Sequence, residues 1–272
     1  MTRPARGTRR DSQAPQRQRH VLALGGHDFS RRRGNEALRD YLLSLSPAEE
    51  PRICLLPTAS GDPREQIFAF RRSLDDLPCI PTHVSLFRLE TEPVAVQEHL
   101  LSQDIVYVGG GSMLNLLAVW RAHGIDEVLR EAWEAGVVLC GQSAGALCWF
   151  EWGITRSAGR ARAVPGLGLL PGTLCVHYHR DHGRRRALLD AGADATLPGY
   201  GIDDGAGLLF RDRHLVEAVS GEGVGGAWRI DSKSAGAAEI ALEIRELDDP
   251  RPAIDAPSAE IIELRRTRAL RP

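Results

Sequence analysis

The sequence lacks any long apolar run: no stretch approaches the roughly 18 residues needed to span a bilayer. It also lacks an excess of either charge, since 34 basic and 36 acidic residues give a formal net charge of −2. A chain so nearly neutral has no general attraction for nucleic acid or for anionic membranes. These absences argue against membrane-spanning and polyanion-binding proteins, and we expect neither nucleic acid nor membrane as a partner.

Cysteine and lysine are scarce as well. Lys233 is the single lysine. Such a preference for arginine usually reflects the base composition of the genome and indicates no function. The five cysteines show no CxxC or CxxH spacing, and most lie in apolar surroundings, as Cys54 does in ICLLP and Cys140 in VVLCG. Their odd number and context favour buried, reduced thiols. We therefore predict a cytoplasmic protein without a cysteine-bound metal.

Composition divides the chain into three parts. Residues 1–19 are basic but lack the apolar core of a secretory signal. A transit peptide is the alternative, but the Pro and Gln content and the scarcity of apolar residues favour a disordered tail. Residues 20–230 are predicted to form an α/β domain. Residues 231–272 are predicted to be a variable C-terminal edge and tail.

Apolar runs that end in glycine alternate with segments of helical spacing through the first 150 residues. Strands are predicted at 20–26, 52–60, 83–89, 104–112 and at the start of 136–150, and helices at 34–46, 63–77, 94–102, 115–124 and 124–135. This alternation is typical of βαβ units. We predict a doubly wound, mostly parallel sheet with helices on both faces. The second half is less regular, with short strands and turns expected at 166–174, 199–210, 214–220 and 225–230.

One pattern indicates nucleophilic chemistry. Residues 141–145, GQSAG, fit G-x-S-x-G, follow an apolar run and precede the helix-competent residues 146–150. In a nucleophile elbow the central serine, here Ser143, occupies a strained turn between strand and helix. The alternative is a glycine-rich turn in which Ser143 only caps the helix. The placement favours catalysis.

A serine nucleophile needs a base, and the sequence has nine histidines. Three of them, His177, His179 and His182, follow the elbow closely. Metal binding and a solvated loop are the alternatives for this cluster, but no carboxylate or thiol set of metal-ligand spacing joins it. The residues alone leave the choice between His177 and His179 nearly even.

A second glycine-rich corner, residues 109–112, closes a predicted strand with GGGS. Three glycines let the backbone approach a ligand and point N–H groups at an anion. Neither a dinucleotide fingerprint nor a phosphate loop is present. A plain tight turn is the alternative, but paired with the residue after Ser143 this corner suits an oxyanion hole.

Five segments together resemble the peptidase E group of serine peptidases. In family order they are LLPTASGD (55–62), VYVGGGS (106–112), GQSAGALCWFEWGIT (141–155), GLGLLPGTLCVHY (166–178) and GYGIDDGAGLLF (199–210). The resemblance covers about residues 20 to 220 and implies a class I glutamine amidotransferase-like fold, shared with cyanophycinase. It implies a site at the carboxyl ends of the strands, where open α/β sheets bind ligands.

The resemblance also implies roles for individual residues. Ser143 falls on the nucleophile and His177 on its base, and the amides of Gly110 and Ala144 fall on the oxyanion hole. We assign substrate binding to Gly111 and Arg180. No cofactor is implied, the expected partner is a small peptide substrate, and a homodimer is left open.

One departure concerns the acidic member of the triad. Relatives often read T-D-S or T-N-D where this chain reads Thr155-Arg156-Ser157, and an arginine cannot accept the histidine N–H. We predict that Glu151 or Asp181 replaces it, Glu151 slightly ahead, or that the site works as a dyad.

The resulting prediction is a serine-type peptidase that cleaves small peptides, including Asp-X dipeptides, through an acyl-enzyme on Ser143. Arg156, Arg180 and Arg184 are candidates to bind an acidic side chain. The alternatives are a non-catalytic amidotransferase-like binding module, favoured by Arg156, and a cyanophycinase-like hydrolase.

Overall fold

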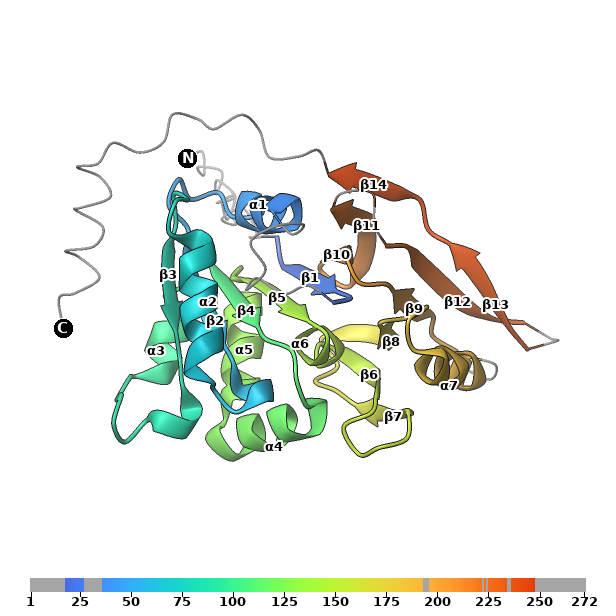
Figure 1. The fold of residues 1–272 in the computed structure, drawn as a ribbon, viewed down its shortest axis with the longest axis horizontal. Coiled ribbons are helices and arrows are strands. Elements are labelled where there is room, and N and C mark those ends of the chain that lie inside the picture. Colours follow the sequence, from blue (N-terminus) through green and yellow to red (C-terminus); the bar gives the residue numbers. More distant parts are fainter. Residues whose placement is uncertain are drawn as a thin grey trace, which may run out of the picture.

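The larger of two sheets forms the centre of the molecule (Figure 1). The computed structural model describes residues 18–26, 36–192, 196–221, 223, 225–233 and 236–247. The sheet order is β14-β11-β10-β1-β5-β4-β2-β3. Its strands are β1 His20–Leu24, β2 Arg52–Leu56, β3 Ile80–His83, β4 Ile105–Val108, β5 Val138–Gln142, β10 Ala206–Arg211, β11 His214–Gly221 and β14 Ile244–Leu247. The run β1-β5-β4-β2-β3 is parallel, whereas β10 pairs antiparallel with both β1 and β11.

Side-chain alternation along β1 shows how this sheet is covered. Leu22 and Leu24 join a buried cluster with α1 and α2, whereas Val21 and Ala23 join the opposite cluster with α3, α4 and α5. The bounds are α1 Glu36–Ser44, α2 Arg64–Leu74, α3 Val96–Leu101, α4 Met113–His123 and α5 Ile125–Glu134. Successive residues of a strand point to opposite faces, so both faces of the sheet are buried. The α/β class with helices on both faces is confirmed.

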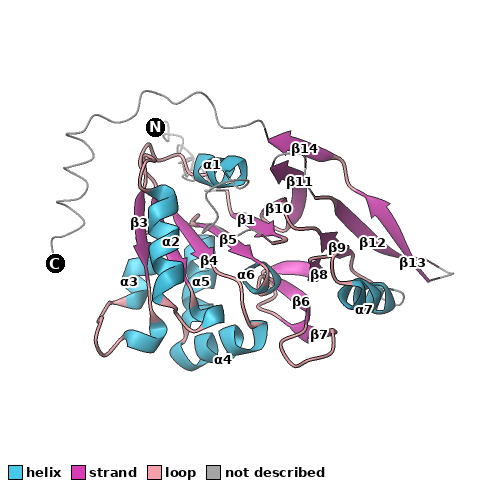
Figure 2. Ribbon diagram, viewed as in Figure 1, coloured by secondary structure: helices cyan, strands magenta, loops and turns pink. Residues whose placement is uncertain are grey.

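A second sheet lies beside the first and has the order β13-β12-β9-β8-β6-β7. Its strands are β6 Phe150–Thr155, β7 Arg162–Pro165, β8 Leu170–Val176, β9 Gly199–Ile202, β12 Ala227–Lys233 and β13 Gly236–Ala241. Helix α7, His182–Gly192, packs on it through a small cluster that contains Ile154, Leu188 and Ile230 (Figure 2). The sequence predicted short strands here but not a separate sheet, because strand partners distant in sequence leave no periodic signal.

Two predicted elements are wrong in detail. Residues 83–89 are not a strand: β3 ends at His83, and a short 3-10 helix, η2, spans Leu86–Arg88. The buried carboxylate of Asp62 accepts hydrogen bonds from Ser85 Oγ and Phe87 N, both at 3.1 Å, and these bonds hold a bent chain. Another 3-10 helix, η1, spans Thr58–Ser60.

The helix predicted after the elbow is also shorter than expected. Helix α6 spans only Ala144–Leu147, and β6 begins at Phe150. Trp149 and Phe150 are fully buried, and Phe150 packs edge-on against Phe210 of the larger sheet. Burial between the two sheets therefore overrides the local helix propensity of this segment.

The predicted tail lies largely outside the described residues, since the structure describes only residues 18 and 19 of it. Arg19 pairs with Asp212 at 2.7 Å and lies over the ring of Trp133. At the other end, β12 runs across the boundary predicted at residue 230. Strands β14 and β13 each lie at one edge of their sheet, opposite β3 and β7. Residues 248–272 lie outside the described part.

All five cysteines are buried and free, as predicted. Within the described ranges, no helix combines the length and the apolar character needed to span a membrane.

Candidate active site

Ser143 stands at the carboxyl end of β5 in a backbone conformation that few non-glycine residues adopt. Its φ is 51° and its ψ is −114°. Such strain persists only where the surrounding structure imposes it. The backbone N–H of Ser143 donates to the carbonyl of Leu24 on the neighbouring strand β1, at 3.1 Å. This is the sharp turn that the G-x-S-x-G pattern predicted.

The two glycines of the pattern are required by close approach of the backbone. A Cβ on Gly141 would lie 2.1 Å from the carbonyl oxygen of Gly145. A Cβ on Gly145 would in turn lie 2.3 Å from the carbonyl oxygen of Val108 on β4. Any side chain at either position would push the elbow away from the strands that hold it.

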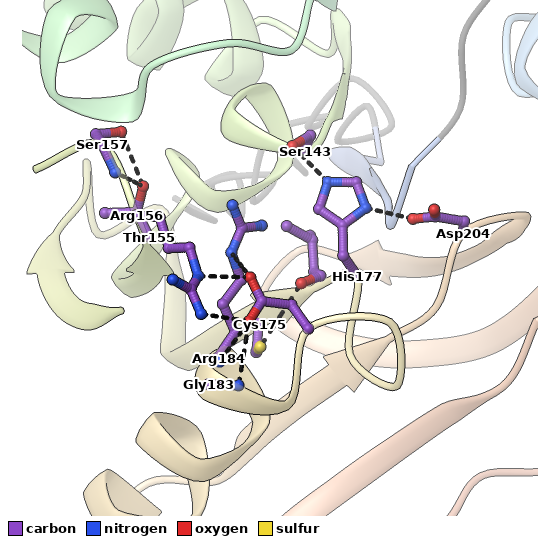
Figure 3. Close-up of polar contacts among 11 residues, drawn as sticks. Ser143, Thr155, Arg156, Ser157, Cys175, His177, Gly183, Arg184 and Asp204 are labelled. Atoms are coloured by element: carbon purple, nitrogen blue, oxygen red, sulfur yellow. Dashed lines mark hydrogen bonds and ion pairs between the residues drawn. The ribbon is translucent and has the colours of Figure 1, made fainter. Parts of the chain in front are cut away.

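His177 lies directly against the serine. Its Nε2 is 3.0 Å from Ser143 Oγ (Figure 3). His177 follows β8 of the smaller sheet and also has a positive φ, 57°. The histidine therefore comes from one sheet and the serine from the other, and the structure brings together this predicted pair.

A third residue, Asp204, was not among the predicted site residues, yet it forms a Ser–His–Asp triad with Ser143 and His177. Asp204 Oδ1 accepts a hydrogen bond from Nδ1 of His177 (Figure 3). This bond leaves Nε2 of the neutral ring free to accept from Ser143 Oγ. Asp204 lies in the turn between β9 and β10, where the chain passes from the smaller sheet to the larger one.

The carboxyl group of Asp204 is ionised at neutral pH. Burial acts to raise its pKa, but hydrogen bonds and charges from His177 and Arg180 outweigh this effect and leave the pKa below its usual value. Arg180 Nη1 donates to Asp204 Oδ2 at 2.8 Å. A negative carboxylate at this position can stabilise an imidazolium.

The structure contradicts both predicted candidates for the acid. Asp181 accepts two hydrogen bonds from Arg156, at 2.7 and 2.9 Å, and this pairing lowers its pKa. Glu151 lies on β6, with its carboxylate 3.5 Å from the amide of Gly172 and 4.0 Å from Arg213. The prediction for Glu151 assumed a long helix after the elbow, whereas the chain turns into a strand there.

A local signal for Asp204 was present but weak. Asp203-Asp204-Gly205 is a common turn composition, and it stands 27 residues after His177. The proximity of Gly26 shows how tightly the structure holds it: a Cβ there would lie 2.1 Å from Asp204 Oδ1 and 2.8 Å from His177 Cε1. Only the crossing between the sheets brings these residues together.

His179, the rival base, lies elsewhere. Its Nδ1 is 3.1 Å from Asp203 Oδ2, and its ring packs edge-on against Trp228 with centroids 4.2 Å apart. His177 is thus the histidine at the serine, as the resemblance implied.

The predicted oxyanion hole lies on the other side of Ser143. A Cβ on Gly110 would be 3.4 Å from Ser143 Cβ, which places this glycine against the elbow. Ala144 follows the serine directly and starts α6. Gly111 differs, because a Cβ there would lie 2.2 Å from the carbonyl oxygen of Ala59. Its Cα therefore faces the loop after β2.

An open pocket of about 520 Å³ adjoins His177. Three arginines and one aspartate give it positive character. The full lining is Arg156, His177, Arg180, Asp181, His182, Gly183 and Arg184. Arg184 is only 16% exposed and pairs with Asp181 at 3.3 Å, and its buried Nη1 has no hydrogen-bond partner among the described residues. Arg180, predicted to bind substrate, lines the pocket and also binds Asp204.

The chain is similar to proteins of one peptidase family. The model of peptidase family S51 matches residues 21–218. The uncharacterized peptidase YgaJ of Bacillus subtilis (strain 168) is 41% identical over 230 residues, which are 84% of this chain and 99% of that protein.

Two solved structures share the fold. A peptidase from an acI-B1 actinobacterium superposes with a TM-score of 0.63 at 18% identity, over 84% of this chain and 96% of that one. A putative peptidase E protein from Listeria monocytogenes EGD-e gives a TM-score of 0.54 at 16% identity, over 73% of this chain and 97% of that one.

The class is therefore that of peptidases with an α/β fold. Within this class, the chain belongs to peptidase family S51, which confirms the resemblance to the peptidase E group.

Proposed function

We propose that this peptidase is of the serine type and hydrolyses small peptides through an acyl-enzyme on Ser143. The observation that carries the proposal is the row Ser143, His177 and Asp204, joined by two hydrogen bonds. A serine hydroxyl becomes an effective nucleophile when an oriented base can remove its proton. Asp204 orients the base and stabilises its charged form.

The reaction has two halves. Ser143 Oγ forms a bond to the carbonyl carbon of the peptide while its proton passes to His177 Nε2. The C–N bond then breaks, and His177 returns the proton to the leaving amine. A water molecule next attacks the ester, with His177 again as base, and the freed acid leaves Ser143 in its original state.

We assign stabilisation of the oxyanion to the backbone N–H groups of Gly110 and Ala144. Gly110 lies against Ser143, and Ala144 follows it in the chain. Fixed donors aimed at the developing negative charge are often the largest single contribution to such a reaction.

The substrate class follows from the cationic pocket beside His177. Three guanidinium groups there share two carboxylates, because Asp181 pairs with both Arg156 and Arg184 whereas Asp204 pairs with Arg180. The remaining positive charge belongs to the group of Arg156, Asp181 and Arg184, and it would attract a substrate carboxylate. We therefore propose small acidic peptides, with Asp-X dipeptides the first to test. We also keep a cytoplasmic location, on the ground of the free buried cysteines.

The non-catalytic alternative loses its main support. It rested on Arg156 at the place expected for the triad acid. Arg156 instead forms a bidentate pair with Asp181, and Asp204 supplies a carboxylate to His177.

Labelling with a fluorophosphonate probe tests the mechanism. The wild-type protein should be labelled at Ser143, and Ser143→Ala should lose both labelling and peptidase activity while its melting temperature stays close to wild type. Hydrolysis by the alanine variant at the wild-type rate would refute the assignment.

A dipeptide panel tests the substrate class. We expect Asp-X substrates to be cleaved faster than Ala-X or Leu-X, and Arg184→Met to reduce this preference. Arg186→Met is the matched control, because Arg186 lies on the same helix, is 78% exposed and pairs with Asp190. Equal loss in both variants, or no preference in wild type, would remove the assignment of Arg184. Cleavage of a branched Asp-Arg polymer in the same panel would favour the cyanophycinase-like alternative.

A further inference from the structure

The side chain immediately before the nucleophile has a fixed orientation. Gln142 Oε1 accepts a hydrogen bond of 2.7 Å from the hydroxyl of Tyr107. Tyr107 lies on the neighbouring strand β4, is 3% exposed and stacks on Phe70 with ring centroids 5.9 Å apart. Tyr107, a rigid core residue, thus holds the Gln142 amide with Oε1 toward its hydroxyl.

The other end of that amide lies at the predicted oxyanion hole. A Cβ on Gly110 would lie 3.2 Å from Gln142 Nε2 and 3.4 Å from Ser143 Cβ. The absence of a side chain at Gly110 therefore leaves space in which the Nε2 donor, the Gly110 backbone and Ser143 lie together. Gly110, Gln142 and Ser143 are all partly exposed.

The sheet order separates the two sides of Ser143. Strand β5 lies between β1 and β4. Gly26, which follows β1, lies against Asp204 and His177, whereas Gly110, which follows β4, lies against Gln142. Because His177 must protonate the leaving amine, the carbonyl oxygen of the substrate points toward the β4 side.

We propose that Gln142 Nε2 is a third donor to the oxyanion, beside the amides of Gly110 and Ala144, and that Tyr107 is a positioning residue for it. This inference rests on the proposed serine mechanism. A side-chain donor held by a buried hydroxyl is preorganised, so it needs no reorientation as charge develops on the oxygen.

Two substitutions at Gln142 test the donor. Gln142→Met keeps the length of the side chain and removes the donor. Gln142→Glu also removes it, but keeps an acceptor for Tyr107 and so protects the fold. Loss of one oxyanion donor costs about 10²- to 10³-fold in kcat. We expect a fall of this order in Gln142→Met, with KM nearly unchanged, and a fall at least as large in Gln142→Glu.

The readouts separate this inference from the mechanism itself. If wild-type Ser143 is neither labelled nor active, the serine mechanism fails. If wild type is labelled and active but both Gln142 variants keep its kcat, only the present inference fails. A rise in KM at constant kcat would also overturn it, because the donor would then bind the ground state equally well.

Tyr107→Phe tests the positioning role. It should lower kcat less than Gln142→Met does, and the double variant should be no slower than Gln142→Met alone, because Tyr107 acts only through Gln142. Additive losses would contradict this. Gln66→Met is the matched control: its Nε2 lies 2.7 Å from a Cβ built on Gly109, one residue from Gly110. An equal loss of kcat in that variant would show that the effect is not specific to the amide at Ser143.

Discussion

Two His–Asp pairs lie just beyond the ends of strands β8 and β9, yet only one of them lies against Ser143. His177 pairs with Asp204 and lies 3.0 Å from Ser143, whereas His179 pairs with Asp203 and packs on Trp228. The pairs are chemically alike: the two histidines follow β8, two residues apart, and the two aspartates are adjacent residues after β9. The difference teaches that a catalytic assignment depends on where the backbone aims a side chain. His177 has the positive φ that turns it toward the elbow.

The largest expected effect separates the two histidines. His177→Ala should lower kcat/KM by on the order of 10⁴-fold or more, because Ser143 loses its base. His179→Ala should cost less than about tenfold, since its ring does not reach the serine. Steady-state kinetics on one peptide substrate measures both. Comparable losses at the two positions would abolish the distinction drawn here.

Substitution of Asp204 should lower activity more than substitution of Asp203, as for the two histidines that they bind. Asp204→Asn should lower kcat by on the order of 10³- to 10⁴-fold, because an amide can donate to Nδ1 and hold the wrong tautomer. Asp203→Asn keeps the shape of a residue that binds the amide of His179 at 2.8 Å, and should lose far less. The thermal melts of both variants show whether either has lost its fold. A greater loss of activity in Asp203→Asn would reverse the roles.

A smaller effect is expected from Arg180, which binds Asp204 Oδ2. Its charge helps to hold the pKa of Asp204 below the usual value. Arg180→Gln should therefore raise the pKa of Asp204, which NMR titration of its side-chain carboxyl group measures directly. The rise should be small, because the arginine is 78% exposed and solvent screens it. An unchanged pKa of Asp204, with Arg186→Gln as control, would show that Arg180 has no electrostatic influence on this carboxylate.

The smallest effect concerns stability. The fold lowers the pKa of Asp204, so its ionised carboxylate adds to the free energy of unfolding. This stabilisation is fully present above the pKa of the unfolded state, near 3.8, and is lost as pH falls through the lower pKa of the folded state. The carboxylate is 36% exposed, so this contribution should be about 0.5 kcal/mol or less. Asp204→Asn should accordingly melt slightly below wild type at pH 7 and approach it below pH 3.8. A constant difference across this range would show that the carboxylate charge is not responsible.

The sequence predicted the first half of the fold well, for a local reason. Apolar runs such as β1, β4 and β5 are buried on both faces, and a strand of this kind has a recognisable composition. The second half lacked such signals. The pairing of β9 with β12, for example, joins segments that no local pattern relates.

The candidate site likewise contains residues that a local pattern predicts and residues that it does not. Ser143 and its two glycines could be predicted because the elbow is made within five consecutive residues. The acid could not. Glu151 was favoured on the spacing of a helix that ends at Leu147, and Asp181 on its proximity in sequence to His177, although Arg156 binds it.

By itself, the sequence determined the elbow, the family and the α/β class. Each of these depends on contacts between residues that are neighbours in the chain, or on segments that follow one another in a recognisable order. Only the tertiary structure showed that Asp204 is the carboxylate beside His177, the histidine that the family resemblance had favoured over His179. Ser143 and His177 belong to different sheets, and Asp204 lies in the turn that connects these sheets. Their meeting depends on packing of the two sheets over a shared core, which no spacing along the chain records.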